Sequence, residues 1–232
     1  MKKILMVMMM IGAAATTAVA GEWAGNAEVG FVQTGGNTDT SSLNVKGKAI
    51  NDADDWRSTV EAGALQSKDT GTTTSEKYNF AVQEDWKGLS AGYLFARLSY
   101  EQDKFGGYNS RTSETVGYGF DILKSDDKQW NAEVGAGARQ TEDVAGVKVS
   151  DTVMRASTVF NWKISEVATF SQELKTEGGK EGYITNSVTA LTNQVAGNLS
   201  SKISYAVQNN SKAPVGTKAS DTILSASLVF SY

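Results

Sequence analysis

Cysteine and histidine are both absent from the 232 residues of this chain. Without cysteine the protein has neither disulfides nor thiolate chemistry, and without histidine it lacks the most common general base and metal ligand. A serine hydrolase of the usual kind needs a histidine to activate its nucleophile. We therefore expect no enzyme, no cofactor and no metal site, although a mechanism that uses carboxylates alone, such as Glu28 with Glu61, stays open.

Excess positive charge is also lacking, because 22 lysines and arginines face 26 aspartates and glutamates. A mildly acidic protein has no electrostatic basis for binding nucleic acid, so we expect no nucleic-acid partner. Proline occurs once, at Pro214, while 23 glycines are scattered along the chain. That composition suits a continuous β-wall better than a helical protein.

Long apolar runs are missing as well. The run from Ile4 to Ile11 follows Lys2 and Lys3 and leads to the triplet Ala18-Val19-Ala20. A membrane-spanning helix needs about 20 apolar residues, so this run is too short to be one. Basic residues, a short apolar run and an Ala-x-Ala triplet, in that order, are typical of a secretory signal peptide. We predict a signal peptide over residues 1–20 and a mature domain over residues 21–232. Removal of the two lysines lowers the basic count from 22 to 20 and the formal charge from −4 to −6.

What the chain does contain is alternation of apolar and polar side chains, in twelve stretches between Glu22 and Tyr232. In the first stretch Ala27 and Val29 alternate with Glu28 and Gly30. Each stretch is roughly ten residues long, the length of a tilted membrane-spanning strand. The pattern predicts an all-β fold, a 12-stranded antiparallel transmembrane β-barrel of the bacterial outer-membrane type, closed by pairing of the first and last strands.

The connections between these stretches alternate in length. Short ones are expected at residues 51–55, 87–90, 124–129, 165–166 and 193–198, and generally longer ones at 34–40, 67–75, 102–110, 141–150, 176–182 and 209–220. In bacterial barrels the short turns face the periplasm and the long loops face outward. Both chain ends then lie on the periplasmic side.

Aromatic residues support the same arrangement. All five tryptophans lie on the apolar parity at the short-turn rim and, with the terminal tyrosine, predict a girdle at one membrane interface; the set is Trp23, Trp56, Trp86, Trp130, Trp162 and Tyr232. An amphipathic last strand that ends on an aromatic residue resembles the signal read by the outer-membrane assembly machinery. The expected partners are therefore outer-membrane lipid, the barrel assembly machinery during biogenesis, and small solutes or ions.

A soluble exported β-barrel that binds a ligand is the competing architecture, with the apolar parity facing a core and the charged parity facing water. Alternation alone does not separate the two, because both have one apolar face. The tryptophan rim and the strand lengths favour the membrane barrel.

The stretch from Trp23 to Thr40, and above all Thr34-Gly35-Gly36-Asn37-Thr38-Asp39, resembles the opening of the salt-induced outer-membrane protein family, often called YdiY-like. The resemblance extends over the mature chain through the strand spacing and the final Phe230-Ser231-Tyr232. It implies a small exported barrel in the cell outer membrane with a connection to salt or osmotic stress. It supplies no catalytic residues.

The polar parity places ten basic and seven acidic side chains toward the lumen. The predicted lumen residues are Glu28, Lys46, Lys48, Arg57, Glu61, Lys77, Asp85, Arg97, Glu101, Arg111, Glu133, Arg139, Arg155, Glu173 and Lys175, together with Asp121 and Lys202. One interpretation is a structural barrel whose charges pair across the lumen and plug it. The other is a narrow pore for small polar solutes or ions, with a mild preference for anions. Inward glycines would leave room for a pore, although Tyr93 and Phe95 could fill that room.

Overall fold

The structure is a computed structural model that describes all residues except 1–21, 36–40, 70–71, 106–107 and 214–217. The predicted signal peptide, residues 1–20, lies outside the described residues. Within the described ranges, no helix is long and apolar enough to span a membrane.

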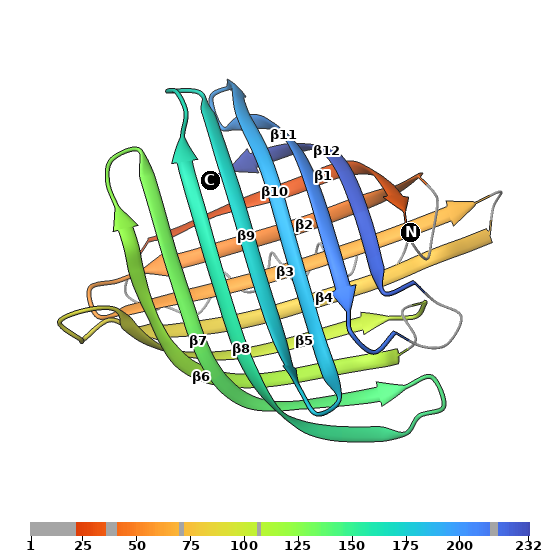
Figure 1. Cartoon of the computed structure of the whole chain (residues 1–232). Coiled ribbons are helices and arrows are strands. Elements are labelled where there is room, and N and C mark those ends of the chain that lie inside the picture. The colour runs from red at the N-terminus through yellow and green to blue at the C-terminus, as the bar shows by residue number, and fades with distance from the viewer. Residues whose placement is uncertain (1–21, 36–40, 70–71, 106–107, 214–217) are drawn as a thin grey trace.

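The described chain forms twelve strands. They are β1 (Trp23–Gly35), β2 (Ser41–Asp52), β3 (Trp56–Asp69), β4 (Thr72–Trp86), β5 (Tyr93–Asp103), β6 (Tyr108–Lys124), β7 (Lys128–Asp143), β8 (Lys148–Lys163), β9 (Ala168–Gly179), β10 (Gly182–Ala196), β11 (Leu199–Asn210) and β12 (Ser220–Ser231). Each strand pairs antiparallel with its neighbours in sequence, and β1 pairs with β12, so the sheet closes into a barrel (Figure 1). Closure satisfies the backbone hydrogen bonds of every strand, as a wall in lipid requires. The predicted fold class and strand number are confirmed.

The two parities of each strand face opposite sides of this wall. Val134 and Leu228 lie on the outer surface with 52% and 57% of their area exposed, whereas Glu28 and Asp85 lie on the inner face with 3% and 1% exposed. An apolar exterior around a charged interior is the arrangement of a transmembrane barrel and the reverse of a soluble one. The soluble alternative is therefore wrong for this structure.

Each end of the barrel is characterised by the connections between its strands. At the end that holds Trp23 and Ser231, called here the short-turn end, two to six residues connect successive strands. At the opposite end, called the hairpin end, β3 runs to Asp69 and β4 starts at Thr72, and β7 ends at Asp143 and β8 starts at Lys148, so the longer loops expected at 67–75 and 141–150 are mostly strand. β9 and β10 are joined there by only Lys180 and Glu181, so the long loop expected at residues 176–182 is wrong. Gly182 begins β10 with φ of 99°, a conformation that an L side chain rarely adopts, which fits glycine at this tight turn.

The predicted aromatic girdle follows the short-turn end. Trp56 on β3 lies directly opposite Trp86 on β4, and both side chains are exposed on the outer face. Trp130 and Trp162 are also exposed outward, on the adjacent strands β7 and β8. Tyr232 is exposed and Trp23 is half-buried. These positions suit rings that sit at the boundary between lipid and water.

Candidate functional site

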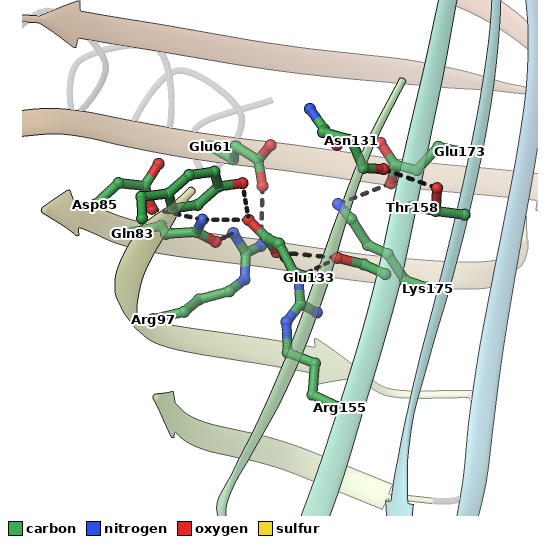
Figure 2. Close-up of polar contacts among 12 residues, drawn as sticks. Glu61, Gln83, Asp85, Arg97, Asn131, Glu133, Arg155, Thr158, Glu173 and Lys175 are labelled. Atoms are coloured by element: carbon green, nitrogen blue, oxygen red, sulfur yellow. Dashed lines mark hydrogen bonds and ion pairs between the residues drawn. The ribbon is translucent and has the colours of Figure 1, made fainter. Parts of the chain in front are cut away.

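Most of the predicted lumen charges lie in several groups, each on particular strands. At the short-turn end a set of hydrogen-bonded side chains, called here the closing network, joins the wall of β3, β4 and β5 to that of β7 and β8 (Figure 2). Its members are Arg57, Glu61, Gln83, Asp85, Tyr93, Arg97, Glu133, Arg155 and Ser157.

Glu133 on β7 is the centre of the closing network. Its carboxylate accepts hydrogen bonds from the Gln83 amide at 2.8 Å and the Tyr93 hydroxyl at 3.0 Å. On the other side it accepts from the Ser157 hydroxyl at 2.9 Å and the Arg155 guanidinium at 3.2 Å. Four donors on β4, β5 and β8 thus converge on one carboxylate, which satisfies a charge that would otherwise be costly to bury.

Gln83 extends the network across β4. Its amide also donates to Asp85 at 2.9 Å, and Asp85 is bound by the Arg57 guanidinium at 2.6 Å. Arg97 donates to the Gln83 carbonyl at 3.3 Å and to Glu61 at 2.9 Å. Charges on β3, β4 and β5 are therefore neutralised in pairs, and Gln83 connects those pairs to Glu133.

Aromatic rings fill the same end of the lumen. Tyr93 and Phe95 are 8% and 3% exposed on the inner face of β5. A Cβ added at Gly119 would lie 2.2 Å from the Tyr93 ring, and one at Gly117 would lie 2.7 Å from the Phe95 ring. The glycines of β6 therefore make space for these two rings rather than for an open channel.

A second charged group lies toward the hairpin end. Lys77 is 3.6 Å from Glu101 and 3.4 Å from Asp103, and Arg111 is 3.8 Å from Glu101. The Tyr108 hydroxyl donates to Glu101, and the Arg111 guanidinium lies over the Tyr108 ring. This group binds β4, β5 and β6 together near the mouth of the barrel.

Arg139 on β7 belongs to the hairpin end as well. Its guanidinium donates to the Gly182 carbonyl at 3.2 Å and lies 3.6 Å from Asp151 and 4.0 Å from Glu177. Glu177 also accepts from the Ser113 hydroxyl at 2.7 Å. The contacts of Gly182 and Glu177 attach the β9–β10 hairpin to β7 and β6.

A third group lies where β1 meets β2 and β12. Glu28 accepts from Lys202 at 2.8 Å and from the Ser227 hydroxyl at 2.9 Å. Lys48 is 3.4 Å from Glu61. Glu28 and Glu61 are therefore each engaged by separate cations.

Between these groups lies a lumen cavity of about 370 Å³. Its charged lining is six basic and four acidic side chains, namely Lys46, Lys77, Arg97, Arg111, Arg155 and Lys175 with Glu61, Glu101, Glu173 and Glu177. A second hollow of about 180 Å³ at the hairpin end shares Arg111 and Ile184 with the first. The two hollows therefore lie next to each other.

Several residues of these groups were not among the predicted lumen charges. Gln83, Tyr93 and Ser157 hold Glu133, and Asp103 and Asp151 pair with Lys77 and Arg139. Strand parity identifies all five as inward, but parity does not say which polar side chains meet across the lumen. Asp121, which was among the predicted charges, is instead exposed near the end of β6.

Comparison with known sequences gives one family. A family model described as "Protein of unknown function, DUF481" matches residues 27–232. The chain is also 26% identical over 195 residues to the "Uncharacterized protein YdiY" of Escherichia coli strain K12, a match that covers 82% of this chain and 75% of that protein.

Three solved structures with similar folds are more distant in sequence. The NanC porin has a TM-score of 0.60 at 13% identity, with 88% of this chain and 98% of that one covered. The COG4313 outer membrane channel from Pseudomonas putida F1 has a TM-score of 0.53 at 9% identity, with 93% and 97% covered. The translocator domain of the autotransporter NalP from Neisseria meningitidis has a TM-score of 0.53 at 8% identity, with 97% and 93% covered. At these identities the likeness is one of fold.

Proposed function

The chain belongs to the DUF481 family, and we propose that this member is a non-enzymatic barrel of the outer membrane that forms a narrow passage for small polar solutes or ions, with a preference for anions. The apolar exterior and the girdle of tryptophans support residence in a lipid bilayer. Outer-membrane lipid and, during biogenesis, the barrel assembly machinery are the partners that this residence implies.

The lumen cavity of about 370 Å³ is the observation that carries the passage. Its lining has two more basic than acidic side chains, which favours anions in the same way that basic rings do in selective channels. The cavity and the hollow at the hairpin end are both lined by Arg111 and Ile184, so the two lie next to each other, and the passage would run through them in that order.

The closing network supports a second candidate, a structural barrel with a plugged lumen. Arg57, Asp85, Tyr93 and Glu133 line neither the cavity nor the outer hollow. Their contacts join β3 to β4, and β4 and β5 to β7 over β6, so these side chains occupy lumen space at the short-turn end. A passage through this barrel therefore has to pass between, or transiently separate, these side chains.

Conductance of the refolded protein in planar lipid bilayers tests the passage. We expect small single-channel steps, and in a KCl gradient a reversal potential with the sign of chloride selectivity, because the cavity is net basic. The control is the same protein added after heat denaturation. Currents no larger than those of bare lipid would contradict the passage and favour the plugged barrel.

The salt-related name of the family that the sequence resembles supports a further part of the proposal, a role under osmotic stress. We expect cells that lack the gene to grow more slowly than their parent at high NaCl, and a plasmid copy to restore growth. Equal growth of both strains across NaCl concentrations would argue against this role.

A further inference from the structure

Five of the six basic side chains that line the lumen cavity have an acidic partner. Arg97 lies 2.9 Å from Glu61, and Lys175 lies 2.7 Å from Glu173. The other three pairs are Lys77 with Glu101 at 3.6 Å, Arg111 with Glu101 at 3.8 Å, and Arg155 with Glu133 at 3.2 Å. Their charges are therefore largely neutralised within the wall.

Lys46 on β2 is the exception. It lines the cavity, and within the described part of the chain its ammonium makes no hydrogen bond or ion pair, interacting with Glu28 and Glu173 only through space. Its register partner on β1 is Glu28, but Glu28 is already bound by Lys202 at 2.8 Å and Ser227 at 2.9 Å. An ammonium in a narrow lumen without a bound counter-ion attracts an anion, because the surrounding wall screens charge less than bulk water does.

Neutral polar groups line the cavity on the same side of the barrel. Asn44 precedes Lys46 on the same face of β2, and Ser204 and Ser225 lie on β11 and β12. All three are buried in the inner wall, with 5%, 3% and 3% of their area exposed. Amide and hydroxyl groups donate and accept hydrogen bonds, so they suit the hydroxyl groups of a solute whose charged end meets the lysine.

We propose that Lys46, with Asn44, Ser204 and Ser225, forms a binding site for a small hydroxylated carboxylate. The inference rests on the lumen cavity of the proposed passage and names the chemistry of its occupant. A carboxylate forms short, charge-assisted hydrogen bonds with an ammonium. The volume of about 370 Å³ is at the lower end of the range for small-molecule sites and exceeds the need of a chloride ion.

Calorimetric titration of the refolded, detergent-solubilised barrel with sodium gluconate tests the site directly. We expect the wild-type protein to bind gluconate and Lys46→Gln to bind it about tenfold more weakly or less, because one charge-assisted contact is lost. Lys124→Gln is the matched control, since it removes the same charge from an exposed position at the end of β6 that does not line the cavity. Sorbitol, which is similar in size but uncharged, should bind the wild-type protein no better than gluconate binds Lys46→Gln.

Heat-modifiable migration on gels verifies that both variants form the barrel. Absence of gluconate binding to the wild-type protein, or equal affinity of Lys46→Gln and the wild type, would overturn the inference. Gluconate binding by a protein that conducts no current would support the binding site and contradict the passage. Conductance without any gluconate affinity would support the passage and contradict the binding site.

Discussion

Replacing Val134 with arginine should lower the free energy of unfolding of the barrel in lipid vesicles by about 2–4 kcal/mol, the cost of a basic residue near the middle of a bilayer. Val134 is exposed on the outer face of β7, four residues beyond the girdle residue Trp130. Four residues of a tilted strand rise about 10 Å along the barrel axis, which brings this position close to the midplane of the apolar band. Denaturant unfolding of the refolded protein, followed by tryptophan fluorescence, measures the difference.

Ala206→Arg is the control for the arginine itself. Ala206 lines the lumen cavity from β11, so a new arginine there points into polar space and should change stability by less than about 1 kcal/mol. Val134→Leu controls for the change of size at the outer position. Equal losses at Val134 and Ala206 would show that the two faces of the wall are not lipid and water.

The alternation of side chains was enough to predict twelve strands, their antiparallel order and the apolar exterior of the wall. The reason is that lipid contact imposes one rule on every strand, and a strand has a period of two. Trp56 and Trp86 illustrate this. Both lie on the outward-facing parity, and the register of β3 and β4 places them opposite each other in the girdle. The sequence predicts less well where each strand ends. Polar residues such as Thr176 and Glu177 are equally acceptable in a loop and in a strand that projects beyond the membrane, so β9 was predicted too short.

The closing network could not be predicted in the same way. Strand register determines which residues are neighbours in the wall, but Gln83 on β4 and Glu133 on β7 lie on strands that do not pair. Their contact depends on the curvature of the barrel and on two inward aromatic rings that pack over glycines. The ion pairs of adjacent strands, such as Arg57 with Asp85, were within reach of the sequence because they face each other in register.

Removal of the central carboxylate is the second change with a large expected effect. Glu133→Ala should lower the free energy of unfolding by about 3 kcal/mol, since it leaves the guanidinium of Arg155 without its counter-ion. The side chains of Glu133 and Arg155 are only 11% and 6% exposed, so water solvates the unpaired guanidinium only weakly. The same denaturant titration in lipid vesicles measures the loss. Glu173→Ala is the matched control, because its pair with Lys175 lies in the cavity with 35% and 25% exposed and should contribute less than about 1 kcal/mol.

The same variant distinguishes a narrow passage from a plug. The Glu133 carboxylate joins side chains of β4 and β5 to those of β8 inside the lumen, so its loss should raise single-channel conductance above that of the wild type. Arg97→Ala removes a different link, the one from Glu61 to Gln83, and should raise conductance without leaving Arg155 unpaired. Because Arg97 also lines the cavity and is basic, this variant should conduct more current with a weaker preference for anions. If neither variant conducts more than the wild type, the constriction lies elsewhere and the closing network serves stability alone.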